Sequence, residues 1–429
     1  MPEPTQQAIK TRILFFCEAV TLAHVARPIV LANALDGEQF DIHVAQHPRY
    51  RSLLGEAFYT EHEIDSISPP QFNQALADGT PLYDESTLNA YVEEDLALIA
   101  KVQPDIIVGD FRISLGVSAE LAGVPLIALS NAYWSPYCRG KYVVPDIPLT
   151  RILGPTLGQW LFTLARPVAF ALHCGPMKKL RKRRGLPSLG FNLKAVYTHA
   201  DYTLYADAPG LYDMDPLPEN HRFIGPVIWS PQYPRPDWWA ELPSDRPIVY
   251  ITLGSSGPPE LLPELLAAVG QLEVTAIVST AGAAFPKEGT LTTADNIYLA
   301  PYLSGEEAVQ LASLVICNGG SPTTHQALVE GVPVIGVASN MDQYLNMAMI
   351  EKQEAGRCVR GASCTADALA REVLLLLEEP RYAEAAQALA VKLRAADAAA
   401  EFCKLVDQIQ QSIVAGKLQL PSSHASVSP

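Results

Sequence analysis

The sequence from Ile316 to Met347 reads ICNGGSPTTHQALVEGVPVIGVASNMDQYLNM. Its pattern predicts a buried strand, a glycine turn, a short helix, a second buried strand, and a polar turn that opens another helix. Gly319 and Gly320 in the first turn let a ligand approach the backbone closely. This strand–turn–helix order is typical of an α/β fold with a parallel sheet.

The first turn is also a candidate anion site. Pro322 suits the first position of a helix that runs to about Glu330, and Ser321 is its predicted N-cap. The start of such a helix directs free N–H groups and the positive end of its dipole at the ligand. Thr323 and Thr324 add hydroxyl donors. We therefore predict that the turn binds a diphosphate.

Strands and helices alternate through two halves of the chain, which indicates βαβ units. In the first half we expect strands at 12–17, 40–46, 105–110, 125–130, 200–208 and 223–227, and helices at 27–35, 84–102 and 113–122. In the second half we expect strands at 247–254, 274–280, 296–300 and 357–360, with helices at 260–272, 305–311 and from about 365 to 415. Between the halves, residues 229–247 hold five prolines and little periodicity, so they form the predicted linker.

Composition excludes several classes of protein. The net charge of −15 argues against duplex nucleic acid as a partner. The seven cysteines are scattered and form no CxxC pair, which favours a reduced, cytoplasmic protein without a zinc site. The N-terminus lacks the apolar core of a signal peptide, and no apolar run reaches 18 residues, so no spanning helix is expected.

The opening stretch resembles the donor signature of family 1 glycosyltransferases, the UDP-glycosyltransferase-like enzymes of the two-domain GT-B fold. The family pattern is roughly H-G-G-x-G-T-T-x-E-A-L-x-x-G-V-P, a strand, and D-Q-x-x-N-A. The residues that match it in order are Gly319, Gly320, Thr323, Thr324, Ala327, Leu328, Gly331, Val332, Pro333, Asp342, Gln343 and Asn346. Two positions depart from it: the leading His is Asn318, which still donates a hydrogen bond, and the Glu is Gln326.

The first half resembles the family at LAHVARPIVLANAL. There the family places a Gly-His before a helix, and the His is the general base; His24 aligns with it, and Arg27 stands at the family's Pro position. Asp110, at the end of a later strand, fits the family's Asp that orients the base. The resemblance thus implies that His24 and Asp110 are catalytic.

Inverting glycosyl transfer needs a base, a group that orients it, and charge stabilisation for the departing diphosphate. Histidine suits the first role because imidazole titrates near pH 6.5. A carboxylate on the other ring nitrogen fixes the tautomer. Backbone N–H groups at a helix end stabilise the leaving group without a metal, so we expect no cofactor.

The resemblance assigns further residues to the donor. The diphosphate is expected at Asn318, Gly319, Gly320, Ser321, Thr323, Thr324, Gly254 and Ser255. The nucleoside is expected at Tyr302, Leu303 and Gln326, and the sugar hydroxyls at Asp342 and Gln343. Glu18 follows the first strand directly and is an acceptor-side candidate, with a solvated turn carboxylate as its alternative.

Other signals have plainer interpretations. Asp213 and Asp215 form a DxD pattern among prolines, without partners for a metal site. His325 is expected on its helix without catalytic duty. The apolar run at 158–172, followed by KKLRKRR at 178–184, predicts a core helix and a solvated basic helix face, with a weak membrane-surface patch as the alternative.

The sequence therefore predicts two Rossmann-like domains of a GT-B fold that face each other across a cleft. Their bounds are 1–228 for acceptor binding, 229–247 for the linker, 248–395 for nucleotide-sugar binding, 396–415 for a helix returning to the first domain, and 416–429 for a tail. The predicted activity is metal-independent transfer from a UDP- or dTDP-linked sugar to a hydroxyl of a small or lipophilic acceptor. A nucleotide-sugar 2-epimerase and a non-catalytic nucleotide- or glycan-binding protein are the alternatives.

Overall fold

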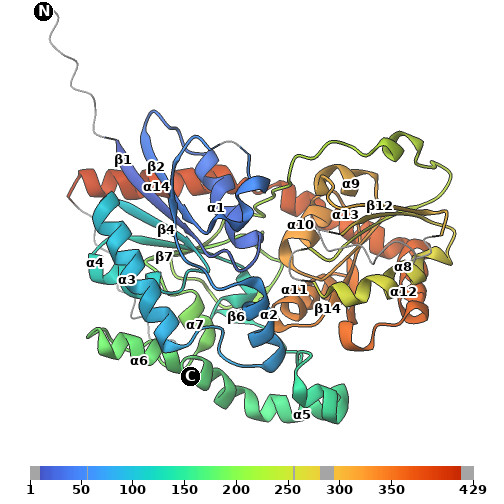
Figure 1. Ribbon diagram of the computed structural model, residues 1–429, viewed down its shortest axis with the longest axis horizontal. Coiled ribbons are helices and arrows are strands. Elements are labelled where there is room, and N and C mark those ends of the chain that lie inside the picture. Colours follow the sequence, from blue (N-terminus) through green and yellow to red (C-terminus); the bar gives the residue numbers. More distant parts are fainter. Residues whose placement is uncertain (1–9, 56, 255–256, 281–293, 417–429) are drawn as a thin grey trace, which may run out of the picture.

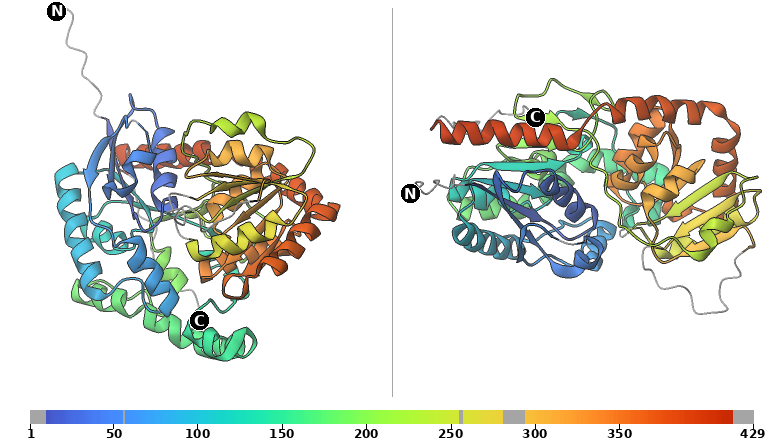
Figure 2. Two further views of the ribbon diagram at one scale, coloured as in Figure 1. Left: turned by 45° about the vertical axis from the view of Figure 1, so that its right-hand side comes forward. Right: turned by 90° about the horizontal axis from the view of Figure 1, so that it is seen from above.

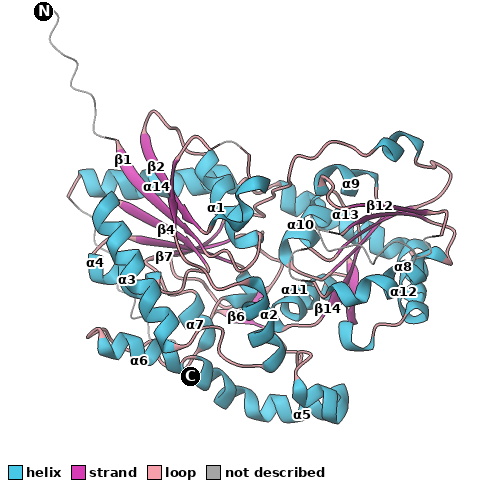
Figure 3. Ribbon diagram, in the orientation of Figure 1, coloured by secondary structure: helices cyan, strands magenta, loops and turns pink. Residues whose placement is uncertain are grey.

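Two α/β halves stand side by side in the computed structural model (Figure 1), which describes residues 10–55, 57–254, 257–280 and 294–416. Figure 3 shows that each half is built around one sheet with helices against it. In both sheets every strand pair is parallel. Parallel sheets bury both faces under helices, which explains why most of the strands read as continuous apolar runs.

The N-terminal sheet has seven strands in the order β3-β2-β1-β4-β5-β7-β9. Their bounds are β1 Thr11–Cys17, β2 Phe40–Gln46, β3 Thr60–Glu63, β4 Ile106–Asp110, β5 Leu126–Ser130, β7 Tyr202–Tyr205 and β9 His221–Phe223. The chain enters at the centre of the sheet, builds one side, and then crosses back past β1. The two strands β1 and β4 are neighbours, so the turns that follow Cys17 and Asp110 lie at the same edge, where ligands bind in such sheets.

The helices of this half are α1 Ala23–Asn33, α2 Pro69–Asp78, α3 Glu85–Val102, α4 Leu115–Ala122, α5 Pro148–His173, α6 Gly175–Arg183 and α7 Leu193–Tyr197, with short 3-10 turns at Pro48–Leu53 and Ala132–Trp134. Helix α5 bends at Gly154, where φ is +74°. A small antiparallel pair, β6 Cys138–Arg139 and β8 Asp213–Met214, joins two loops.

The C-terminal sheet has six strands in the order β12-β11-β10-β13-β14-β15. They are β10 Ile248–Thr252, β11 Thr275–Ser279, β12 Ile297–Ala300, β13 Leu314–Cys317, β14 Val334–Ala338 and β15 Gly356–Arg360. The helices are α8 Leu262–Gly270, α9 Gly305–Leu311, α10 Ser321–Val329, α11 Met341–Lys352, α12 Ala366–Glu378, α13 Pro380–Arg394 and α14 Ala398–Val414, with 3-10 turns at Pro259–Leu261 and Gly361–Ser363.

Helix α14 leaves the C-terminal half and lies along the N-terminal half, as the right-hand view of Figure 2 shows. Its apolar side chains, led by Phe402 and Leu405, join the core formed by β1 and α1. The rings of Phe402 and Phe15 are 6.0 Å apart. The prediction of two α/β domains and of a C-terminal helix that returns to the first domain is confirmed.

Several local predictions need correction. Helix α1 begins at Ala23 rather than Arg27, so His24 lies in its first turn. The strand expected at 223–227 is only His221–Phe223, because the chain then turns toward the linker. The linker 229–247 contains a 3-10 turn at Asp237–Glu241. Most importantly, α5 is not a core helix: of its residues, only Thr150, Gly158 and Phe162 are buried.

Candidate active site

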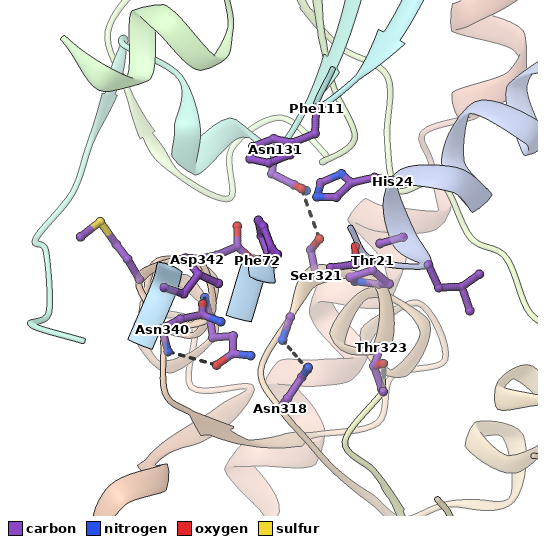
Figure 4. Close-up of a pocket in the computed structure, with 18 of the residues that line it drawn as sticks. Thr21, His24, Phe72, Phe111, Asn131, Asn318, Ser321, Thr323, Asn340 and Asp342 are labelled. Atoms are coloured by element: carbon purple, nitrogen blue, oxygen red, sulfur yellow. Dashed lines mark hydrogen bonds between the residues drawn. The ribbon is translucent and has the colours of Figure 1, made fainter. Parts of the chain in front are cut away.

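A cavity of about 610 Å³ lies between the two halves. Its walls combine the carboxyl ends of strands from both sheets, which is where doubly wound folds bind ligands. The N-terminal half contributes His24 and Asp110, and the C-terminal half contributes Asn318 and Gly320. Figure 4 is a close-up of this cavity, in which His24 and Asn318 are labelled.

His24 and Asp110 form a hydrogen-bonded pair in the N-terminal wall. His24 Nδ1 lies 2.7 Å from Asp110 Oδ1, and the carboxylate is fully buried. A carboxylate is an acceptor, so the proton belongs on Nδ1 and the lone pair on Nε2. The imidazole also stacks on the ring of Phe111, with centroids 4.8 Å apart. Phe111 has a positive φ of 60°, a strained conformation that turns its ring onto His24.

Arg27 holds the same carboxylate from the other side. Its Nε and one terminal nitrogen each donate to Asp110 at 2.8 Å, and the other terminal nitrogen donates to Asn131 Oδ1 at 2.8 Å. Burial lowers the pKa of the guanidinium, but the charge of Asp110, its hydrogen bond to Arg27 and the charge of Asp207 together raise the pKa overall. This bidentate pair fixes both oxygens of Asp110 in place.

The opposite wall is the turn between β13 and α10. Gly319 has a φ of +79°, and a Cβ there would lie 2.8 Å from Met347 Cγ. Only glycine fits this position. The Asn318 side chain accepts a hydrogen bond from the Gly320 N–H at 3.0 Å, which closes the turn as an Asx motif.

The start of α10 touches the N-terminal half. The helix begins at Ser321 with Gly320 as its N-cap, so the prediction of Ser321 as the N-cap was wrong by one position. The Ser321 hydroxyl instead donates to Asn131 Oδ1 at 3.2 Å across the cavity (Figure 4). Asn131 thus links Arg27, and through it the His24–Asp110 pair, to the helix end that faces the cavity.

The sequence of this molecule matches known proteins over most of its length. Residues 263–409 match the family described as erythromycin biosynthesis protein CIII-like, C-terminal domain. A PGL/p-HBAD biosynthesis rhamnosyltransferase of Mycobacterium bovis (strain BCG / Pasteur 1173P2) is 47% identical over 387 residues, which are 90% of this chain and 85% of the relative. A PGL/p-HBAD biosynthesis glycosyltransferase of Mycobacterium tuberculosis (strain ATCC 25177 / H37Ra) is 46% identical over 389 residues, 91% of this chain and 90% of the relative.

The chain belongs to this family of glycosyltransferases. The fold agrees: the spinosyn rhamnosyltransferase SpnG complexed with thymidine diphosphate superimposes with a TM-score of 0.65 at 18% identity, covering 92% of this chain and 100% of that one. The predicted membership of the GT-B, family 1-like glycosyltransferases is therefore confirmed. It supports transfer over the 2-epimerase and the non-catalytic alternatives.

Most residues expected at the donor site of the enzyme line the cavity. They are Gly254, Tyr302, Leu303, Asn318, Gly320, Ser321, Thr323, Gln326, Asp342 and Gln343. Gly319 and Thr324 lie behind this surface. Thr324 is fully buried, and its hydroxyl donates to the carbonyls of Gly320 and Ser321 at 3.2 Å and accepts from the Asn346 amide at 2.8 Å. Ser255 falls outside the described residues.

Besides Asn318 and Ser321, three of these side chains have protein partners. Asp342 Oδ1 accepts from Trp134 Nε1 at 2.7 Å, across the cavity. Gln343 caps α11, its Oε1 accepting from the backbone N–H of Ser339 at 2.8 Å. The Gln326 amide donates to the carbonyl of Trp229 in the linker at 2.5 Å. A donor that reaches these groups must share or replace those bonds.

Glu18 is not an acceptor-side residue. It is fully buried outside the cavity lining, where it accepts from Ser66 at 2.6 Å and from Arg112 at 3.1 Å. Burial raises the pKa of this carboxyl, although Arg112 opposes the effect. Arg112 also bonds Asp95, at 3.1 Å. The position of Glu18 directly after β1 suggested that it faces the cavity. The carboxylate instead points into the interior, where it belongs to a buried ion-pair network.

One end of the cavity is apolar, and we call it the apolar end. Helices α2, α5 and α7 line it. The lining residues there are Phe72, Ala75 and Leu76 of α2, Phe162, Ala165, Ala169 and Phe170 of α5, and Leu193 and Tyr197 of α7. A long hydrophobic molecule fits such walls better than a sugar does.

Arg27, Asn131 and Trp134 are cavity residues that we did not expect from the sequence. Two weak signals pointed to them. Arg27 lies three residues after His24, on the same face of α1. Asn131 directly follows β5, at the carboxyl edge of the sheet. Trp134 had no such signal.

The remaining polar candidates serve other contacts. Asp213 pairs with Lys352 and Asp215 with Arg139, on the surface. His325 Nε2 lies 3.2 Å from Asp207 Oδ1 in the interior. Over the described ranges, no group of three or more His, Cys, Asp or Glu side chains gathers in a way that could hold a metal ion.

Proposed function

We propose that the enzyme transfers a sugar from a UDP- or dTDP-linked donor to a hydroxyl of a lipophilic acceptor, with inversion and without a metal. One observation carries the proposal. A single cavity is lined by the His24–Asp110 pair on one side and by the Asn318–Thr323 turn on the other. The base and the site for the leaving group thus face one another.

In the proposed reaction, His24 Nε2 accepts the proton of the acceptor hydroxyl. The oxygen of that hydroxyl forms a bond to the anomeric carbon as the bond from this carbon to the diphosphate oxygen breaks. The imidazolium that results donates through Nδ1–H to Asp110, 2.7 Å away. The carboxylate stabilises this cation and keeps the imidazole oriented. Phe111 holds the ring from its face.

The electron pair of the broken bond leaves with the nucleoside diphosphate. The start of α10 presents backbone N–H groups and the helix dipole to that charge. The hydroxyls of Ser321 and Thr323 stand beside it in the cavity wall. These groups supply the electrostatic stabilisation that departure of the diphosphate needs.

The choice of donor and acceptor follows from two lines of support. The M. bovis relative is named a rhamnosyltransferase, and the SpnG neighbour was crystallised with thymidine diphosphate, so dTDP-rhamnose is the first donor to test, beside UDP-sugars. The apolar walls of α2, α5 and α7 favour an acceptor with a hydrophobic body. Its hydroxyl would point toward His24.

The test is a panel of dTDP- and UDP-sugars, each with a pool of lipophilic alcohols and phenols, monitored for released nucleoside diphosphate and glycosylated product. Replacing His24 by Ala should lower kcat about 10²- to 10⁴-fold, because the reaction loses its general base. His62→Ala, a histidine outside the cavity lining, is the matched control and should keep the wild-type rate. EDTA should leave the rate unchanged.

Retention of the wild-type rate in His24→Ala would refute the proposed base. A product that keeps the anomeric configuration of the donor would refute inversion. Loss of activity in EDTA that Mg²⁺ restores would refute metal independence. Each of these readouts addresses one part of the proposal separately.

A further inference from the structure

Helix α5 carries an unusual amount of exposed apolar surface. Six of its large side chains are 48–80% exposed: Ile152, Leu157, Trp160, Leu164, Val168 and Leu172. We call these six residues the α5 face. In Figure 1 and in the left view of Figure 2, α5 lies along the lower edge of the molecule, away from both sheets.

Five of the six residues of the α5 face form one continuous stripe. Beyond the bend at Gly154, its residues follow each other at intervals of three or four, from Leu157 to Leu172, and such spacing places them on one side of a helix. The opposite side of the helix, with Phe162 and Phe170, lines the apolar end of the cavity. One helix therefore separates the cavity from an apolar surface, and isolated proteins rarely leave such a contiguous patch uncovered.

The charge around the α5 face is positive, although the whole chain carries −15. Residues 147–200 contain nine Lys and Arg and no Asp or Glu. Helix α6 follows α5 and exposes Lys178, Lys179, Lys182 and Arg183. Lys178 stands over the ring of Phe191, with 4.0 Å from the ammonium to the centroid, and that ring is itself 59% exposed. Apolar and basic side chains thus share one edge of the molecule.

Some of these cations are paired with acids from other elements. Arg183 contacts Glu85, Arg184 contacts Glu93 and Arg181 contacts Glu120. The Glu85 and Glu93 pairs lie on the α3 side of α6, and Arg181 is buried. The exposed lysines Lys179 and Lys182 give the α6 surface its positive charge.

We propose that the α5 face and the α6 lysines dock the enzyme on an anionic lipid bilayer. An amphipathic helix of this kind lies in the interface, with its apolar side in the acyl boundary and its basic neighbours at the headgroups. Trp160, central in the stripe, suits the interfacial zone. Among the described residues, no helix is long and apolar enough to cross a bilayer, so the attachment is peripheral.

This docking also gives the apolar end of the cavity a supply of substrate. The part of the inference that concerns the acceptor rests on the proposed function: a lipophilic acceptor dissolved in the bilayer enters between α2 and α5, whose inner sides line the cavity. Binding to the bilayer itself needs no catalysis. The two ideas therefore fail in different experiments.

The test uses the full chain and extruded vesicles of phosphatidylcholine with 30–40% phosphatidylglycerol (roughly the range that gives a strong surface potential), measured by flotation. The wild type should bind these vesicles at least tenfold better than vesicles of phosphatidylcholine alone, and NaCl should weaken the binding. The double variant Trp160→Gln/Leu164→Gln should lose most of it, and Lys179→Gln/Lys182→Gln should lose the preference for phosphatidylglycerol.

The matched control is Val391→Gln, which replaces an equally exposed apolar side chain (72%) on α13. It should bind like the wild type. All variants should keep the wild-type rate of nucleoside diphosphate release with a water-soluble acceptor in the absence of vesicles, because none of the replaced residues lines the cavity. That measurement separates a failure to dock from a failure of the active site.

Three outcomes would overturn the proposal. The first is that the wild-type enzyme does not float with the vesicles. The second is that all variants bind the vesicles as well as the wild type does. The third outcome combines two results: the wild type does not bind vesicles, and sedimentation shows a dimer that Trp160→Gln/Leu164→Gln dissociates. That outcome would assign the α5 face to a second copy of the chain instead.

Discussion

At the scale of single residues, the proposed base His24 is held by a carboxylate that is itself held by a cation. Asp110 accepts from His24 at 2.7 Å and from two nitrogens of Arg27 at 2.8 Å. Arg27 thus fixes Asp110 independently of His24. One terminal nitrogen of Arg27 lies only 3.1 Å from His24 Nδ1, so the guanidinium opposes a second positive charge on the ring.

Arg27→Met should lower kcat, because Asp110 loses the partner that fixes both of its oxygens and His24 loses part of its orientation. The variant should also lose roughly 3–5 kcal/mol of stability, because a buried carboxylate loses its partner. Arg27→Lys should restore part of both. Steady-state kinetics and a thermal melt of both variants check this. A wild-type kcat in a destabilised Arg27→Met variant would limit Arg27 to a structural role.

The sequence brought the proposed base His24 and its carboxylate Asp110 to one site, but it did not reveal the residues that support them. His24 and Asp110 follow or precede elements with clear periodicity, and the resemblance to a known family named their roles. Arg27 and Asn131 acquire their positions only from packing between α1, β4 and β5. Glu18 was predicted at the site but lies in a buried network, because a polar residue after a strand can face either the cavity or the interior. The periodicity of the sequence does not distinguish these two orientations.

At the scale of elements, the edge of the N-terminal sheet contains a half-buried histidine. His221 of β9 lies 2.7 Å from the Tyr205 hydroxyl of β7 through its Nδ1, and its ring meets Tyr137 edge-on at 5.2 Å. Burial lowers the pKa of His221 to about 4, against about 6.5 in an unfolded chain. The unfolded state therefore binds more protons between these values, and stability falls as the pH drops through that window.

We expect acidification from pH 7.5 to pH 5 to remove about 2 kcal/mol through His221 alone. For a unit of this size, that corresponds to roughly 4 °C in Tm. His221→Gln keeps an oxygen acceptor for Tyr205 and cannot titrate, so its Tm should fall less by that amount over the same pH range. Scanning calorimetry of both proteins at the two pH values makes the comparison. An identical loss in the variant would show that other groups carry the acid sensitivity.

The sequence predicted the strands better than it predicted the surroundings of helix α5. The central strands were predicted to within a few residues, because short apolar runs between turns have few other interpretations. The prediction of α5 as a core helix was wrong, because an apolar pattern does not say what covers it. An apolar stripe such as Trp160, Leu164 and Val168 looks alike in sequence whether a protein core, a lipid surface or water faces it. Only the absence of a covering element within the described chain distinguishes the cases, and that is a tertiary fact.

At the scale of the whole molecule, side chains as well as the linker tie the two halves together. Asn131 contacts Ser321, Trp134 contacts Asp342, and Asp207 contacts His325. Asp146, which precedes α5, makes several contacts with the C-terminal half. Its carboxylate pairs with Arg360 and accepts from the Ala362 N–H at 3.0 Å, while its own N–H donates to the Ser339 carbonyl at 2.8 Å. In the proposed reaction, these bonds set the distance between His24 on one wall of the cavity and the Asn318–Thr323 turn on the other.

Asp146→Ala should loosen that closure. The pair is largely buried, with 8% and 17% of the side chains exposed, so its loss should cost about 2 kcal/mol of the closed state, less than a fully buried pair because Arg360 keeps some solvent. The KM for the donor should then rise by up to about 30-fold, while kcat changes less, and X-ray scattering should show a larger radius of gyration.

Asp215→Ala is the matched control, since it removes an exposed aspartate–arginine pair within the N-terminal half alone. If Asp146→Ala leaves both the KM and the radius at the wild-type values, the remaining cross-cavity bonds, rather than Asp146, hold the halves together.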